Sequence, residues 1–379
     1  MSVRRRARGA RLGAALAVVL AASAAGCGGG AGPVSSGPPG IDSPDATFDA
    51  SGGPEQLAFD AAGNLYVSDC SAARVYVVGP SATLRRVVGS DLEGDAGYEG
   101  DGKQALRALV RCPIGIAVDD AGTLFVVDHG NNRVRKIRSD GVISTFAGAG
   151  AVGVDAGGYA GDGGPATAAR LQEPVGVGLG AGGDVYVADR DNNAIRKIDA
   201  DGTITTVIGG SGAGFSGDGG PASDARIDRP QQIVVDPDGN VYFADSGNNR
   251  VRRIDTEGVV STVAGNGRAA TSGDGGPALS AAVWNPTGLA LDDEGNLYVS
   301  QPDDNRIRRV DTTGAIVTVA GGRASPGFSG DGGPATRASF ANPQGLAFDE
   351  GGNLYVADTD NRRIRVIDRG GTIRTFVNG

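Results

Sequence analysis

The sequence predicts an all-β protein, a six-bladed β-propeller made of four-stranded antiparallel blades. A unit that repeats every 56 to 61 residues occurs six times between Pro54 and Gly379, and each copy begins at an equivalent proline. Each copy holds four short runs of β-branched, aromatic and aliphatic residues separated by turn residues. A repeat of this period with four strands per copy is typical of a propeller. The equivalent prolines are Pro54, Pro113, Pro174, Pro230, Pro286 and Pro343.

The fourth copy shows the four expected strands most clearly, at residues 233–236, 241–245, 251–255 and 259–264. The first two are separated by Pro-Asp-Gly-Asn, whose Gly or Asn supplies the positive φ of a tight hairpin. The strands are apolar on both faces, as in Leu346-Ala347-Phe348, which indicates a sheet that is covered on both sides. Because each copy holds all four strands, we expect the ring to close without strand exchange, with residues 41–50 as a possible edge strand of blade six.

The first 26 residues are typical of an export signal. Five arginines (Arg4, Arg5, Arg6, Arg8 and Arg11) precede the apolar run 12–22, which is too short to span a bilayer. Ala24-Ala25-Gly26-Cys27 resembles the lipobox of bacterial lipoproteins, which implies acylation of Cys27, and Gly28 after it resembles outer-membrane sorting. The alternative is an ordinary cleaved signal with an incidental cysteine. Residues 27–53, rich in Gly, Pro and Ser, are expected to form a flexible tether before the propeller at 54–379.

The charge balance argues against nucleic acid as a partner. The formal net charge is -9, and the first 26 residues contain five arginines and no acidic residue. The remainder therefore holds 30 basic and 44 acidic residues, a formal charge of -14. A chain this acidic repels phosphate backbones.

Two motifs of the repeat resemble those of the NHL-repeat family. Leu354-Tyr355-Val356-Ala357-Asp358, followed after two residues by Asn361-Arg362-Arg363-Ile364, is similar to the core motif of that family. The Gly-Asp-Gly-Gly-Pro-Ala linkers at Gly161, Gly217, Gly273 and Gly330 resemble the NHL variant in teneurins and many exported bacterial proteins. The resemblance implies a six-bladed propeller that serves as a binding or scaffolding surface, and we expect a monomer.

Three columns of polar residues repeat around the ring and are interpreted as structural, since a binding site would place different residues in different blades. Asp–Arg and Asn–backbone hydrogen bonds would then fix each loop. An acidic column follows the second strand, at Asp69, Asp128, Asp189, Asp245, Gln301 and Asp358. One arginine column opens the third strand, at Arg74, Arg133, Ala194, Arg250, Arg306 and Arg363. A second lies two residues later, at Tyr76, Arg135, Arg196, Arg252, Arg308 and Arg365.

The linker aspartates raise the question of calcium, because Asp among glycines can enclose a hard cation. These are Asp101, Asp162, Asp218, Asp274 and Asp331. The spacing matches no calcium loop, so we expect each Asp to cap its own turn and no cofactor, with calcium as the alternative. The aromatic residues that precede four of them (Tyr98, Tyr159, Phe215 and Phe328) are expected to fasten the linker to the blade.

The sequence favours a binding module over an enzyme. His129 is the only histidine, so a three-His zinc site is excluded and a Ser-His-Asp triad is disfavoured. The leading hypothesis is a non-enzymatic, exported module that recognises a protein or glycan through the rim of long loops and linkers. One alternative is an exported hydrolase or lactonase with a divalent cation at the channel mouth, and another is a purely structural envelope protein with no discrete ligand.

Residues that break the repeat are the candidate ligand contacts on that rim. Trp284 and Gln301 depart from the pattern in copy five, and His129 fills a variable loop position that we expect to be exposed. Two further cysteines, Cys70 and Cys112, lie on the same rim in adjacent blades, which predicts a disulfide in an oxidising compartment. Two unrelated thiols are the alternative.

Overall fold

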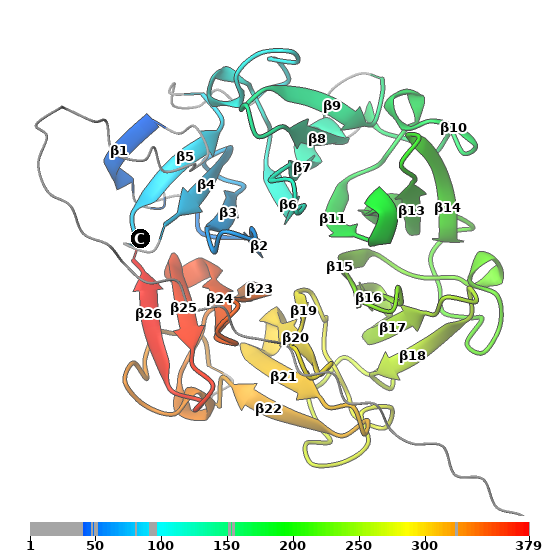
Figure 1. Cartoon of the computed structure of the whole chain (residues 1–379). Coiled ribbons are helices and arrows are strands. Elements are labelled where there is room, and N and C mark those ends of the chain that lie inside the picture. The colour runs from blue at the N-terminus through cyan, green and yellow to red at the C-terminus, as the bar shows by residue number, and fades with distance from the viewer. Residues whose placement is uncertain are drawn as a thin grey trace, which may run out of the picture. The chain divides into compact units, whose positions relative to one another are not determined.

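The computed structural model describes residues 41–46, 48, 52–79, 82–90, 97–150, 153, 156–322 and 325–378. Six antiparallel sheets are arranged in a ring, and their order around it follows the chain (Figure 1). Each sheet contains the four strands of one sequence repeat, so the predicted six-bladed propeller is confirmed. Cys27, the export signal and residues 28–40 of the tether lie outside the described residues. No helix among the described residues is long and apolar enough to cross a membrane.

The innermost strand of each blade begins at the repeat proline or a few residues after it. These strands are β2 (Leu57–Phe59), β6 (Pro113–Val118), β11 (Pro174–Leu179), β15 (Pro230–Val235), β19 (Leu289–Leu291) and β23 (Pro343–Phe348). The second strands are β3 (Leu65–Asp69), β7 (Leu124–Asp128), β12 (Val185–Asp189), β16 (Val241–Asp245), β20 (Leu297–Gln301) and β24 (Leu354–Asp358).

The third and outermost strands complete each blade. The third strands are β4 (Arg74–Val78), β8 (Arg133–Ile137), β13 (Ala194–Ile198), β17 (Arg250–Ile254), β21 (Arg306–Val310) and β25 (Arg363–Ile367). The outermost strands are β5 (Leu84–Val88), β9 (Ile143–Ala147), β14 (Thr203–Gly209), β18 (Val260–Ala264), β22 (Ile316–Ala320) and β26 (Ile373–Val377).

The strand before blade one corrects one expectation. β1 (Ile41–Ala46) pairs with β5 and extends blade one, where the sequence suggested an edge strand on blade six. The reason is topological, because each linker pairs with the outer strand of the blade that it enters. Pro221 bridges Val259, Pro277 bridges Ala315, and β10 (Gly164–Pro165) pairs with β14. β1 occupies the equivalent position in blade one.

The hydrophobic core lies between neighbouring blades. One cluster contains Leu57 and Val67 of blade one together with Ala357, Ile364 and Val366 of blade six, so the ring is closed by the same packing that joins the other blades. Burial of these apolar faces is the main favourable term for a repeat that cannot cover its own sheet.

The same pairing shows where each linker lies in its blade. Residues such as Pro221 and Pro277 bond next to the hairpin between the third and fourth strands, so this part of each linker runs along the outer edge of its blade. The turns between the second and third strands stay at the long-loop rim, where they form short 3-10 helices such as His129–Asn131 and Ser246–Asn248. That rim, around the channel, contains the candidate site.

Candidate functional site

The acidic column is a structural clamp inside each blade. Asp69, Asp128, Asp189, Asp245, Gln301 and Asp358 are all fully buried. The Asp128 carboxylate accepts hydrogen bonds from the backbone N–H of Arg111 (2.7 Å), the Asn131 side chain (2.8 Å) and the Arg135 guanidinium (3.2 Å). Burial raises the pKa of Asp128 to about 6, and these donors oppose the shift. The carboxylate therefore ties the linker, the turn and the third strand together.

The second arginine column provides the partners of the linker aspartates. Arg252 is fully buried, and its Nη2 lies 2.7 Å from Asp218 Oδ1 while it also donates to the carbonyl oxygens of Ser216 and Arg226. The same pairing recurs at Arg135–Asp101, Arg196–Asp162, Arg308–Asp274 and Arg365–Asp331. The expected cap of each linker Asp on its own backbone is thus replaced by an ion pair with a buried arginine, and the geometry does not favour the calcium alternative.

The first arginine column stacks on the linker aromatics. The guanidinium carbons of Arg133, Arg250 and Arg363 lie 4.1, 3.8 and 4.1 Å from the ring centroids of Tyr98, Phe215 and Phe328. Such cation–π contacts stabilise by about 0.5–1 kcal/mol at exposed sites. In blade five, where no aromatic precedes the linker Asp, Arg306 pairs instead with Asp304 at 2.9 Å. The aromatics therefore fasten the linkers, as predicted.

Gln301 belongs to the contacts that fix the linker to its blade and not to a ligand surface. Its side chain is fully buried, and Nε2 donates to Thr271 Oγ1 at 2.9 Å. Thr271 occupies the linker position that is aromatic in the other linkers. The change from Asp to Gln therefore accompanies a second change in the same blade, and the structure removes Gln301 from the candidate ligand contacts.

The two other candidates differ in their placement. Trp284 is partly exposed, in the linker that leads into β19, and it lies outside the hydrophobic core clusters. His129 is also only partly exposed, contrary to the expectation of full exposure, because its Nδ1 lies 3.0 Å from the carbonyl oxygen of Pro174 in the next blade. Burial lowers the pKa of His129, which keeps the ring neutral near pH 7.

The mouth of the central channel is where the blades differ most. A cavity of about 260 Å³ opens there, lined by the first residue after each repeat proline and by His129, Arg190 and Asp303 from the long-loop turns. The six residues after the prolines are Glu55, Ile114, Val175, Gln231, Thr287 and Gln344. Blades two and three present aliphatic side chains, and the other four present polar ones. No repeat rule explains this set, so it is the best candidate for a ligand site.

Glu55 is the carboxyl group of this ring. Burial, together with the negative charges of Asp69 and Asp360, raises the pKa of Glu55 to about 7. Its backbone oxygen accepts a hydrogen bond from Gly345 of blade six (2.8 Å), so it lies at the junction that closes the ring.

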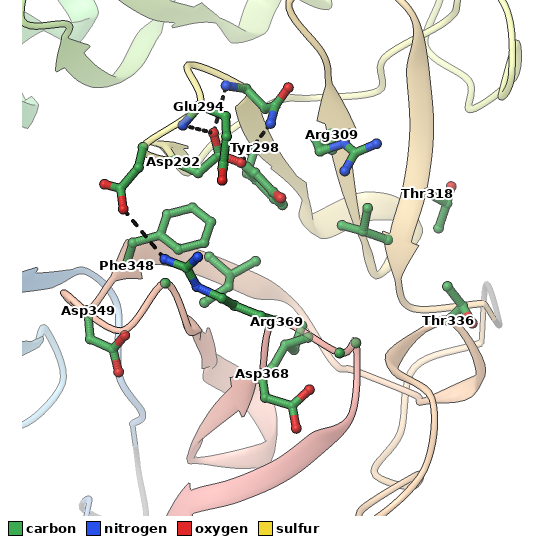
Figure 2. A pocket seen from close by; sticks show the side chains of 18 residues that line it. Asp292, Glu294, Tyr298, Arg309, Thr318, Thr336, Phe348, Asp349, Asp368 and Arg369 are labelled. Atoms are coloured by element: carbon green, nitrogen blue, oxygen red, sulfur yellow. Dashed lines mark hydrogen bonds and ion pairs between the residues drawn. The ribbon is translucent and has the colours of Figure 1, made fainter.

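A larger cavity of about 620 Å³ lies between blades five and six on the hairpin face. Figure 2 shows Tyr298 and Phe348 on its walls, and Arg369 reaches across it to within 3.6 Å of Asp293. Several of its acids are caps that repeat around the ring. Asp292 accepts from the backbone N–H of Asn296, as Asp349 does from Asn353 and Asp236 from Asn240. Because these caps repeat from blade to blade, as the polar columns do, we interpret most of this lining as structural.

The donor set at the channel mouth does not fit a tightly held divalent cation. Within the described part of the chain, no group of three or more His, Cys, Asp or Glu side chains is placed to hold a metal ion. The acidic side chains that line the mouth are Glu55 and Asp303, and the remaining polar lining consists of amides, a hydroxyl, His129 and Arg190. Ca²⁺ takes six to eight oxygen ligands and binds more tightly as more of them are charged, whereas this mouth offers two carboxylates.

The predicted disulfide is present between Cys70 and Cys112, with the sulfur atoms 1.99 Å apart. It joins the second-to-third-strand turn of blade one to the residue that precedes β6 of blade two. At four other junctions an asparagine makes this connection through a hydrogen bond, as from the N–H of Asn285 to Asn249 Oδ1 (3.0 Å). The other three bonds are Glu173 to Asn132, Arg229 to Asn193 and Asn342 to Asn305.

Of the channel-mouth lining, sequence reasoning found His129 and missed the six residues after the repeat prolines. Their signal was present, because the position after each proline is the one that changes chemistry from blade to blade. A departure from a strong column is easy to see in the sequence, as at Gln301, whereas the position after each proline forms only a weak column of different residues. Only the ring geometry brings these six positions to one cavity.

Comparison with known proteins agrees with the fold. Residues 56–155, 154–215, 212–272, 267–326 and 323–379 match the family described as the teneurin NHL domain. Human Teneurin-1 is 34% identical over 236 residues, which cover 56% of this chain and only 8% of that protein. An auxiliary nutrient binding protein from Bacteroides thetaiotaomicron has a TM-score of 0.59 at 16% identity, over 86% of this chain and 69% of that one. A gluconolactonase from Xanthomonas campestris has a TM-score of 0.54 at 15% identity, over 86% and 88% of the two chains. These two likenesses show the fold alone, and the family match shows that the chain belongs to the teneurin NHL domain family.

Proposed function

We propose that this protein is a non-enzymatic, lipid-anchored binding module of the bacterial cell envelope. Its long-loop rim recognises a protein or glycan, and the channel mouth is the centre of that surface. The observation that carries the proposal is the set of six different residues after the repeat prolines, from Glu55 to Gln344, in a chain whose other polar columns repeat. Rigid propellers that display variable residues at one end are suited to recognition.

The mouth supports binding better than hydrolysis. Solved structures with this fold include a gluconolactonase and a nutrient binding protein, so the fold itself is compatible with both activities. A lactonase that polarises its substrate through a divalent cation needs several oxygen ligands, including carboxylates. The acidic lining of the mouth consists of Glu55 and Asp303, so amide oxygens and water would have to supply the remaining ligands.

The cellular location is proposed from the N-terminal sequence. The basic stretch, the apolar run and the Ala-Ala-Gly-Cys27 boundary resemble a lipoprotein signal, and the Cys70–Cys112 disulfide agrees with an oxidising compartment. The propeller is then tethered outside the cytoplasm, more favourably at the outer than at the inner membrane. Changing Cys27 to Ser should move the full chain from the membrane fraction to the soluble fraction, and unchanged partitioning would argue against acylation.

The binding function is tested by affinity capture from envelope extract with the full chain. The Gln231→Ala/Gln344→Ala variant changes the mouth, and Arg369→Ala on the opposite face is the matched control, since Arg369 is mostly exposed there. We expect the mouth variant to lose a specific ligand that wild type and control retain. Trp284→Ala tests whether the partly exposed tryptophan extends the same surface. If all variants capture the same set equally, the long-loop rim is not the binding surface.

A further inference from the structure

The cavity between blades five and six, on the hairpin face, has the dimensions of a small-molecule site. Its volume of about 620 Å³ lies within the ~300–1,000 Å³ that is usual for such sites. The lining comes from the hairpins of both blades and from Thr336 in the linker that enters blade six. The cavity is thus built by two blades, and its residues are separate from those of the channel mouth.

The caps in this lining repeat around the ring, but two other features of its hairpins do not. Asp293 and Glu294 are consecutive acids in the first hairpin of blade five, whereas the equivalent pairs in the other copies contain at most one acid. Arg369 lies in the last hairpin of blade six. The other copies have uncharged residues at that position, which are Pro80, Ser139, Ala200, Thr256 and Thr312.

Two half-buried aromatic side chains, Tyr298 of blade five and Phe348 of blade six, form walls of the cavity (Figure 2). Their ring centroids lie 4.9 Å apart at an interplanar angle of 75°. In blades two and six a phenylalanine of the outermost strand packs against the equivalent aromatic ring, as Phe376 does against Tyr355 at 5.0 Å. Blade five has Val319 at that position, and this smaller side chain lines the cavity beside Tyr298.

The charged groups around the cavity are mostly negative. Five carboxylates and two guanidinium groups line it, and three of the carboxylates accept hydrogen bonds from backbone N–H groups or asparagine amides. Such neutral donors satisfy the oxygens without cancelling their charge. A hollow lined mainly by one sign of charge attracts ions of the other sign, in this case cations. The carboxylates belong to Asp292, Asp293, Glu294, Asp349 and Asp368, and the guanidinium groups to Arg309 and Arg369.

One of these guanidinium groups already places a cation across the cavity. Arg369 Nη2 lies 3.6 Å from Asp293 Oδ2 in the other blade, and Arg369 Nε donates to the Gly351 carbonyl oxygen at 2.7 Å (Figure 2). The side chains of Arg369 and Asp293 are 60% and 81% exposed. An ion pair this exposed contributes little stability, so a cation from solution would compete with Arg369 for the same carboxylate.

We propose that this cavity is a second ligand site, which binds a small organic cation composed of an ammonium group on an apolar body. The ammonium group would lie beside the carboxylates of Asp293 and Glu294. Tyr298 and Phe348 would add cation–π attraction, which favours ammonium ligands. Val319 and the aromatic rings would cover the apolar body. The site does not rest on the function proposed for the channel mouth.

The test measures binding of phenethylamine and benzyltrimethylammonium to the full chain by saturation-transfer NMR and calorimetry. Hydrocinnamate is the anionic probe, hydrocinnamamide is the neutral probe, and acetyl-Ala-Lys-Ala-amide presents the ammonium group on a peptide. Asp293→Asn/Glu294→Gln removes the exposed charges, and Glu257→Gln, at an exposed hairpin position of blade four, is its matched control. Phe348→Leu removes one aromatic wall, since leucine occupies this position in blades three and five.

We expect at least one of the two amines to bind wild type and the Glu257→Gln control. The Asp293→Asn/Glu294→Gln variant should weaken this binding about 3- to 10-fold and Phe348→Leu about 2- to 5-fold, with the fold retained by circular dichroism. Arg369→Gln should strengthen it about 2- to 5-fold, because it removes the competing cation.

The proposal is overturned if neither amine binds wild type or Arg369→Gln, or if the charge-removing variant binds as tightly as wild type. Tighter binding of the anionic, neutral or peptide probe would also overturn it. The channel-mouth variant Gln231→Ala/Gln344→Ala should bind the amines as wild type does. A loss of binding in that variant would place the amine at the channel mouth and not in this cavity.

Discussion

At the scale of single residues, the molecule depends on arginines that are removed from water. Arg135, Arg196, Arg252, Arg308 and Arg365 are among the largest fully buried side chains, and each receives a linker carboxylate. A guanidinium has five donors in a fixed plane, so one side chain can bind a carboxylate and two carbonyl oxygens at once. The glycine-rich linkers, which contain little apolar surface, are positioned by this pairing.

Replacing Arg252 by Ala should therefore destabilise the propeller by about 3–5 kcal/mol, because Asp218 and two carbonyl groups lose the guanidinium donor and the buried Asp245 loses the opposite charge 3.7 Å away. Arg250→Ala is the matched control on the same strand. Arg250 is partly exposed and loses a stack on Phe215 and one hydrogen bond to the Asn248 carbonyl, so we expect about 1 kcal/mol. Urea unfolding measures the free energy of unfolding of both variants. Equal losses of this free energy would show that the buried Arg252 contributes no more to stability than the partly exposed Arg250.

At the scale of elements, neighbouring blades are joined at equivalent places by a hydrogen bond at four junctions and by a disulfide at another. Asn132, Asn193, Asn249 and Asn305 adopt positive φ angles of 51–55° and accept from the residue before the next repeat proline. In blade one the equivalent residue is Ala73, also at φ 51°, which has no side-chain acceptor. The Cys70–Cys112 disulfide joins the same two blades at that place.

Removing the disulfide with Cys70→Ser/Cys112→Ser should cost about 4 kcal/mol, since the bond closes a loop of 42 residues. Adding Ala73→Asn to that variant should restore about 1–2 kcal/mol, because Asn tolerates positive φ and can accept from the N–H of residue 112. Ala73→Gly separates the two effects, as it relieves the backbone without adding an acceptor. If Asn restores no more than Gly in thermal unfolding, the hydrogen bond does not replace the disulfide.

Sequence and structure agree where the physics is local or periodic. The strand positions of the fourth copy, the hairpin turns and the disulfide follow from repeat spacing, turn residues and loop placement. The position of β1 does not follow from the sequence, because the position of an edge strand depends on the strand with which it pairs. Nothing in residues 41–46 favours pairing with β5 over pairing with β26. Apart from His129, the channel-mouth residues were also missed, since they are separated by a full repeat and each looks unremarkable in its own copy.

At the scale of the whole molecule, the ring must close between blade six and blade one, which are farthest apart in the sequence. The junction uses the hydroxyl of Thr359, which donates to the Pro54 carbonyl oxygen at 2.7 Å, and the N–H of Gly345, which donates to the Glu55 carbonyl oxygen. The first apolar cluster packs between the same two blades. Glu55, which also lines the ligand cavity, therefore couples ring closure to the chemistry of the channel mouth.

This coupling predicts a pH dependence of stability. Burial, together with the charges of Asp69 and Asp360, raises the pKa of Glu55 from 4.5 to about 7, so the folded ring favours the protonated carboxyl. The contribution is fully present below pH 4.5 and is lost as the pH rises through about 7, where the ionised group is penalised. Between pH 5 and pH 8, wild type should lose ~2 kcal/mol more unfolding free energy than Glu55→Gln, which keeps the shape without the charge. Parallel stability profiles for the two proteins would show that Glu55 ionises in the folded ring as it does in the unfolded chain.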